Sequence, residues 1–142
     1  MEPDSPVKPH IIFYNLTSSG ASAIVPILNE ILADDYGYEI MDGPHKSAEF
    51  SKKYEPNRPQ FHWTHSPAAC FEQYLQRDDF RFVCLYRDPR DVLISHVKDA
   101  KNSGLFADES EEETYLNYIR TDFNSMFHEA DEWLNLNQGN VL

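Results

Sequence analysis

Three short apolar runs, each followed by a turn and then by helical spacing, constrain the fold of this chain most. They are "HIIFYNL" at residues 10–16, "QFHWTH" at residues 60–65 and "RFVCLY" at residues 81–86. β-Branched and aromatic residues dominate these runs, as is typical of strands. Because strands that alternate with helices pair in parallel through right-handed crossovers, the sequence predicts an α/β fold. We therefore expect a parallel β-sheet flanked by helices.

The first expected helix runs from Ala23 to about Asp35. Its apolar stripe consists of Ile24, Ile27, Leu28, Ile31 and Leu32. This three-and-four spacing is typical of an amphipathic helix. Because Pro26 removes a backbone hydrogen bond, we expect the helix to begin late or to bend there.

Two further helices are expected after a polar residue followed by proline. Ser66-Pro67 precedes "AACFEQYLQ", and Asp88-Pro89 precedes a segment that extends to about Asn102 and ends at Gly104. A polar N-cap with proline at the first helical position is a common helix start. Residues 36–59, which lack clean periodicity, are expected to form a loop with a short helix.

A long amphipathic helix is expected after the acidic stretch "ADESEEET". Its apolar stripe is Leu116, Ile119, Phe123, Phe127, Ala130 and Leu134. We interpret residues 1–9 as a flexible lead-in and residues 10–142 as one domain. Because "NVL" at the end reads as the start of a strand, we expect the carboxy-terminal part of the domain to be missing.

Composition excludes several classes of protein. The formal net charge of −12 argues against a nucleic-acid binder or a binder of anionic membranes, because both favour basic surfaces. Neither the two cysteines nor the six histidines show metal-ligand spacing, so no metal site is expected. The sequence has no signal-peptide pattern at its start and no apolar run long enough to span a bilayer. We expect a cytoplasmic protein.

The strongest chemical signal is "FVCLYRDPRDVLIS" at residues 82–95. Arg87 follows the carboxyl end of an expected strand, where parallel sheets bind ligands. Ser95 lies about two helical turns after Asp88 and so returns to the same face. A guanidinium and a hydroxyl in one crevice suit a phosphate. The alternative is that Arg87 simply pairs with Asp91, four residues on.

The turn "TSSGAS" at residues 17–22 follows the first expected strand. Gly20 and its small neighbours would let backbone amides approach an anion at a helix start. The turn is not a Walker A loop, because the GxxxxGK[ST] pattern is absent. Alone, this is a weak signal.

Taken in order, "TSSGAS", "WTHSP" and "YRDPRDVLIS" resemble the sulfotransferase family, which uses 3′-phosphoadenosine 5′-phosphosulfate (PAPS) as donor. The resemblance implies a P-loop-like sulfotransferase fold. It implies that Arg87 and Ser95 bind the 3′-phosphate of the donor and that His65 is the catalytic base. It also implies that the loop at residues 18–22 holds the 5′-phosphosulfate. That loop consists of Ser18, Ser19, Gly20, Ala21 and Ser22.

The chain departs from the family pattern at two positions and at its end. Ser18 stands where the family normally has a lysine or arginine, and Trp63 stands where a lysine is common. Lysines elsewhere could compensate: Lys46, Lys52 and Lys53. The family's later glycine-rich basic segment is also absent.

Two functions follow from the resemblance. One is transfer of a sulfuryl group from PAPS to a hydroxyl or amine of a small-molecule acceptor. The other is an inactive relative that acts through nucleotide or protein binding. A nucleotide kinase is a third candidate, against which the missing Walker lysine counts. The acceptor and the oligomeric state stay open, a homodimer included.

Overall fold

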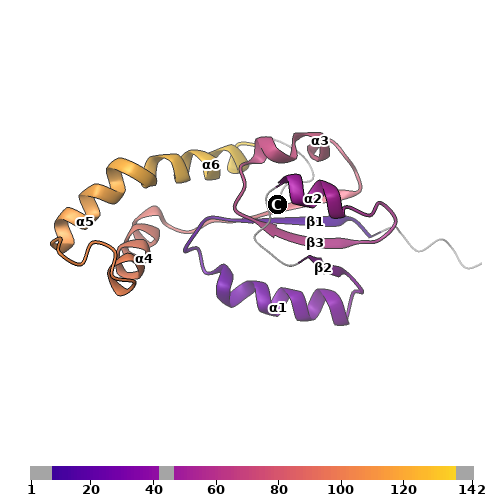
Figure 1. Ribbon diagram of the computed structural model, residues 1–142. Coiled ribbons are helices and arrows are strands. Elements are labelled where there is room, and N and C mark those ends of the chain that lie inside the picture. The colour runs from indigo at the N-terminus through magenta and orange to yellow at the C-terminus, as the bar shows by residue number, and fades with distance from the viewer. Residues whose placement is uncertain (1–7, 42–46, 137–142) are drawn as a thin grey trace, which may run out of the picture.

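The computed structural model describes residues 8–41 and 47–136 and contains a four-stranded parallel sheet (Figure 1). The strand order is β2-β3-β1-β4, with β1 pairing in parallel with both β3 and β4. The strands are β1 (His10–Asn15), β2 (Glu39–Met41), β3 (Gln60–Thr64) and β4 (Phe80–Leu85). This confirms the predicted α/β class with a parallel sheet flanked by helices.

Helices cover both faces of the sheet and extend past its carboxyl edge (Figure 1). They are α1 (Ala21–Asp34), α2 (Ser47–Lys53), the 3₁₀ helix η1 (Ala68–Phe71), α3 (Glu72–Leu75), α4 (Pro89–Asn102), α5 (Glu111–Tyr118), the π-helical segment η2 (Ile119–Phe123) and α6 (Asn124–Leu134). Helix α1 lies on one face, while α2 and α3 lie on the other. Among the described residues, no helix has the length and apolarity needed to cross a bilayer.

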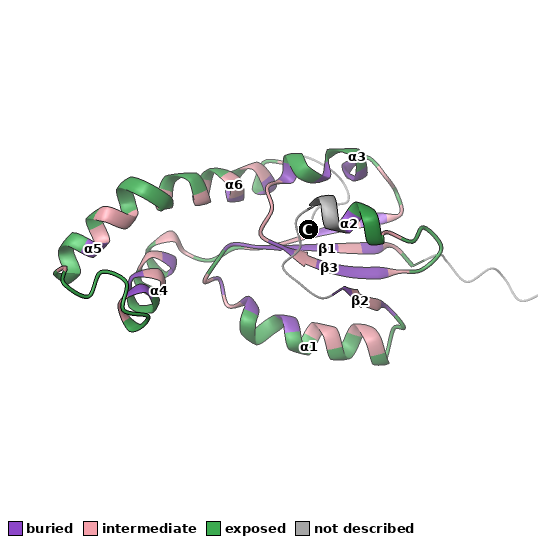
Figure 2. Ribbon diagram, in the orientation of Figure 1, coloured by how far each residue is buried: buried purple, intermediate pink, exposed green. Residues whose placement is uncertain are grey.

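Alternating side chains of the strands form two cores, one on each face of the sheet. Phe13 and Phe61 pack with Val25 of α1 on one face. On the other face the core is larger, and the fully buried Trp133 of α6 packs at its margin. Its strand and helix residues include Ile12, Tyr14, Phe50, Phe71, Phe80, Phe82 and Val92. Figure 2 shows buried residues along strands β1 and β3, between the helices of the two faces. Because both faces of the sheet are covered, side chains on both sides of each strand are mostly apolar, and the strand sequences are nearly continuous apolar runs.

Helix α1 differs from its prediction in its start and in its buried face. It begins at Ala21, and the residues it buries are Ala21 and Val25. The predicted stripe is wrong in part, since Ile24, Ile27 and Ile31 are exposed. Pro26 does not end the helix. Proline has no N–H to donate to the Ser22 carbonyl four residues earlier, and both Ser22 and Pro26 are exposed residues.

The two Pro-containing starts have different outcomes. Asp88 caps α4 as predicted, because its side chain accepts a hydrogen bond from the backbone N–H of Arg90 at 2.9 Å. The prediction of Ser66 as N-cap is wrong: Pro67 is the N-cap of η1, with an extended ψ of 158°. The Ser66 N–H instead donates to Thr64 Oγ1 at 3.0 Å, which draws this residue into the preceding turn.

Residues 36–59 contain the expected short helix, α2, and also the unpredicted strand β2. The long helix predicted after the acidic stretch is present as a continuous helical run of α5, η2 and α6, with the unpredicted π-helical segment η2 in its middle. A π-helical turn shifts the faces before and after it relative to one another. The predicted stripe is therefore buried only in part: Ala130 is buried, whereas Leu116, Ile119 and Leu134 are exposed. The predicted strand start at the chain end lies outside the described residues, as does most of the lead-in.

Candidate anion site at the carboxyl edge of the sheet

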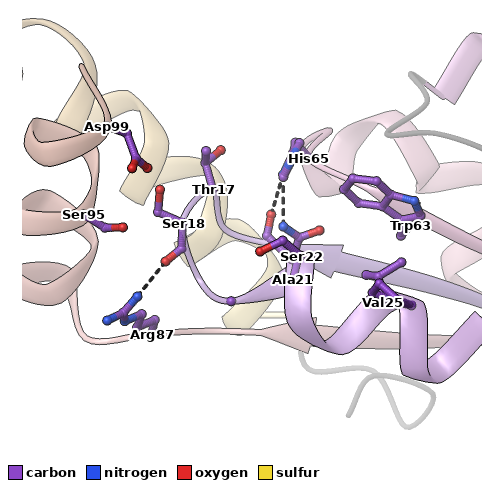
Figure 3. Close-up of a pocket in the computed structure, with 13 residues that line it drawn as sticks. Thr17, Ser18, Ala21, Ser22, Val25, Trp63, His65, Arg87, Ser95 and Asp99 are labelled. Atoms are coloured by element: carbon purple, nitrogen blue, oxygen red, sulfur yellow. Dashed lines mark hydrogen bonds between the residues drawn. The ribbon is translucent and has the colours of Figure 1, made fainter. Parts of the chain in front are cut away.

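A cavity of about 600 Å³ lies where strands β1, β3 and β4 end (Figure 3). Its lining includes seven of the eight residues that the sequence nominated. These seven are Ser18, Gly20, Ala21, Ser22, His65, Arg87 and Ser95. Segments far apart in the chain thus bring a small-residue turn, a histidine, an arginine and a serine to one place. The eighth nominated residue, Ser19, is not part of the lining.

The turn between β1 and α1 depends on two residues with left-handed backbone conformation. Ser18 has φ 59° and Gly20 has φ 98°. Glycine adopts this region freely, whereas a serine there carries strain of about 1–2 kcal/mol. Ser19 is buried, and its backbone N–H donates to the Leu16 carbonyl at 3.0 Å. Ser19 therefore holds the turn in shape, while Ser18 and Gly20 face the cavity.

The amino terminus of α1 opens into this cavity without a side-chain cap. Gly20 is its N-cap and makes no capping side-chain bond, and the first turn carries no acidic residue. By contrast, Asp88 caps α4 and Ser110 caps α5 with side-chain oxygens. An uncapped helix start directs backbone N–H groups and the positive end of the helix dipole outward. This arrangement can bind an anion.

The guanidinium of Arg87 makes one hydrogen bond and one long ion pair within the described part of the protein. Its Nη1 donates to the Ser18 carbonyl at 3.0 Å, and its Nε lies 3.8 Å from Asp91 Oδ2. The pairing with Asp91 that the sequence left open is thus present, but at the long end of the ion-pair range. Two short bonds from Arg90 engage Asp88 instead and lower the pKa of that carboxyl to about 2. Arg87 is therefore the arginine of this cluster that lines the cavity.

His65 is oriented by the backbone at the end of β1. Its Nδ1 lies 2.8 Å from the carbonyl oxygen of the buried residue Asn15. The same Nδ1 also lies 3.3 Å from the Asn15 side-chain amide Nδ2, which could only donate to it. Because the carbonyl only accepts hydrogen bonds and its contact is the shorter of the two, we assign the proton to Nδ1, which leaves a lone pair on Nε2. The Trp63 ring meets the imidazole edge-on, with centroids 5.5 Å apart. With this assignment, the free nitrogen Nε2 is the one that a general base would use.

Four polar or aromatic residues of the lining were missed as site candidates by sequence reasoning: Asn15, Thr17, Trp63 and Asp99. The helical period offered a signal for Asp99, which follows Ser95 by four residues and so shares its face. The lysines proposed to compensate for Ser18 do not line the cavity where they are described. Lys52 and Lys53 belong to α2, across the sheet from α1, and Lys46 lies outside the described residues.

No group of three or more histidine, cysteine, aspartate or glutamate side chains is arranged to hold a metal ion within the described ranges 8–41 and 47–136. What the cavity offers instead is backbone amides, hydroxyls, one guanidinium and one imidazole. These groups suit anion binding combined with proton transfer.

Comparison with protein families agrees with this geometry. A family model described as a sulfotransferase domain matches residues 7–142, which is nearly the whole chain. The chain therefore belongs to the sulfotransferase family, as the three sequence motifs indicated, and its α/β architecture is consistent with the family's P-loop-like fold. Searches of curated proteins and of solved structures found no significant match.

Proposed function

We propose that this chain binds PAPS and transfers its sulfuryl group to a hydroxyl or amine of a small-molecule acceptor. The observation that carries the proposal is the convergence on one cavity of the uncapped α1 start, Arg87, Ser95 and His65. Family membership supplies the reaction class, and these side chains supply matching chemical groups.

The donor would be held at two points. Arg87 and the Ser95 hydroxyl would bind the 3′-phosphate, because a guanidinium gives charged, directional bonds and the hydroxyl adds a neutral donor. The 5′-phosphosulfate would lie at the start of α1, where Ala21 and Ser22 line the cavity and their backbone N–H groups could bind it. PAPS would thus bridge α1 and α4.

The reaction follows from the assigned tautomer of His65. Its Nε2 would take the proton of the acceptor hydroxyl or amine as that oxygen or nitrogen attacks sulfur. The bond between sulfur and the bridging oxygen breaks, and 3′-phosphoadenosine 5′-phosphate (PAP) leaves with the electron pair. Charge on the leaving phosphate would be stabilised by the α1 amides rather than by a lysine, since Ser18 occupies that position. We therefore expect slow turnover.

A second candidate is an inactive relative that retains the nucleotide site. Ser18 favours it, because the described lining contains no lysine to stabilise the leaving group. The two candidates predict the same PAP binding and differ only in sulfuryl transfer.

Replacing His65 tests the enzymatic proposal. We expect the parent chain to transfer radiolabelled sulfuryl from PAPS to at least one acceptor in a panel of phenols, amines, steroids and carbohydrates. His65→Asn should lower this rate at least a hundredfold, because general-base catalysis contributes about 10²–10⁴. Its PAP affinity, measured by calorimetry, should remain within about threefold of the parent value.

The matched control for this test is His128→Asn, which changes an exposed histidine outside the cavity. PAP binding without transfer in the parent would favour the inactive relative. Binding that ATP displaces as well as PAP does would favour a nucleotide kinase. The cytoplasmic location and a homodimer remain proposals, which cell fractionation and sedimentation would test.

A further inference from the structure

Asp99 places a negative charge in a cavity that is otherwise suited to anions. It is the one acidic residue in the described lining, one helical turn beyond Ser95 on the same face of α4 (Figure 3). Within the described parts of the chain, its carboxylate makes no hydrogen bond and no ion pair. The neighbouring His96 imidazole interacts electrostatically with Asp99, but burial lowers the pKa of His96, so this ring is a weak partner for the charge.

The charged groups near Asp99 do little to offset its negative charge. Arg87 is the one arginine or lysine in the described lining, and Asp91 already lies 3.8 Å from its Nε. Two carboxylates thus stand against one guanidinium around the proposed 3′-phosphate position. Side chains four apart on a helix have Cβ atoms about 6 Å apart, so a phosphate on the Ser95 hydroxyl would lie near Asp99.

We propose that Asp99 is a specificity-determining residue that weakens binding of nucleotides bearing a 3′-phosphate. The inference rests on the proposed donor site. At a separation of about 7 Å in water, two unit charges repel enough to change affinity about threefold, and a phosphate dianion doubles the effect in free energy. Asp99 thus reduces the preference of the cavity for PAP over adenosine 5′-phosphate (AMP), which lacks the 3′-phosphate.

The test is a calorimetric titration of PAP and of AMP into the full chain and into Asp99→Asn. We expect the variant to bind PAP about three- to tenfold more tightly, while its affinity for AMP changes less than twofold. Raising the salt from 0.05 M to 0.5 M should shrink the PAP difference, because screening weakens charge repulsion. Asp99→Glu, which keeps the charge, should bind PAP like the parent.

The matched control is Asp34→Asn at the far end of α1, about 20 Å from the cavity by helix length. It removes the same charge from the molecule and should leave PAP affinity within twofold. Equal PAP affinity of the parent and Asp99→Asn would overturn the inference but leave the donor site standing. Failure of both folded proteins to bind PAP would overturn the donor site and the inference together.

Discussion

Two arginines flank β4, one at each end. One side chain is held by several protein contacts, and the other makes few. Arg77 precedes the strand, and Arg87 follows it. Their side chains are about equally exposed, at 40% and 41%. Exposure therefore does not distinguish the two side chains. They differ in how many hydrogen bonds and ion pairs each guanidinium makes within the protein.

Arg77 is bound on several sides. Its Nε and Nη2 donate to the two carboxylate oxygens of Asp79 at 2.9 and 2.6 Å, and Nη2 also donates to the Tyr54 hydroxyl at 2.7 Å. The guanidinium lies 5.1 Å from the ring centroid of Phe80. Such a bidentate, stacked arginine connects the loop before β3 to the start of β4. Arg77 is thus a structural residue.

Arg87 makes fewer and weaker contacts, with one backbone carbonyl at 3.0 Å and one carboxylate at 3.8 Å. Its surroundings include an uncapped helix start and the hydroxyl-bearing Ser95. At the amino edge of the sheet, the arginine charge thus stabilises the fold. At the carboxyl edge, the Arg87 guanidinium keeps donors that a ligand could use. The predictions below test this division.

The largest expected effect is on ligand binding. Arg87→Ala should weaken PAP binding about 10- to 150-fold, because hydrogen bonds to charged groups contribute about 1.5–3 kcal/mol. The free energy of unfolding should fall by less than about 1 kcal/mol, since the lost contacts are exposed. Calorimetry and urea unfolding measure the two quantities.

Arg81→Ala is the matched control. Arg81 belongs to β4 itself, and among the described residues its side chain donates to the carbonyls of Asp78 and Phe80. This variant removes the same charge and should leave PAP affinity within about twofold. Equal loss of affinity in both variants would show that net charge, and not the Arg87 fork, governs binding.

Arg77→Ala should lower the stability of the protein and leave PAP affinity unchanged, the reverse of Arg87→Ala. We expect the free energy of unfolding to fall by about 2 kcal/mol, because the change leaves Asp79 without its two charged bonds and uncovers the ring of Tyr54. PAP affinity of the folded variant should match that of the parent. Urea unfolding followed by circular dichroism tests this, and an unchanged transition midpoint would contradict a structural role for Arg77.

A smaller effect is expected on acid stability. Hydrogen bonds from Arg77 hold the pKa of Asp79 below its ordinary value of 3.8. A carboxyl with a lowered pKa in the folded state stabilises the protein above its unfolded pKa, and this stabilisation is lost as pH falls through the folded value. The parent should therefore exceed Asp79→Asn in stability at pH 7, and the difference should shrink below pH 3.8. Urea unfolding of both proteins across this range would contradict the prediction if the difference stayed constant.

Local signals predicted much of this molecule. Apolar runs marked β1, β3 and β4 to within one residue at each end, because buried parallel strands need continuous apolar sequence. Asp88-Pro89 marked the start of α4, since an N-cap bond forms within a few residues. The placement of Arg87 and Ser95 in one cavity followed from these two elements together.

Features that depend on tertiary packing were not predictable in this way. The apolar face of α1 was ambiguous, because Ile24 and Ile31 are as apolar as the residues that the sheet buries. Strand β2, only three residues long, exists through its pairing with β3. The π-helical η2 has no sequence signature here, and η1 begins one residue later than predicted, with Pro67 in place of Ser66 as its N-cap.

The most direct test of the division between the two edges is an NMR titration that observes arginine Nε–Hε groups while PAP is added. Resonances of Arg77 and Arg87 can be assigned with the corresponding lysine variants. We predict that the Arg87 resonance shifts saturably with PAP, while the Arg77 resonance, held by Asp79, stays in place. Saturable binding that leaves the Arg87 resonance unmoved, or that moves both resonances equally, would contradict the account.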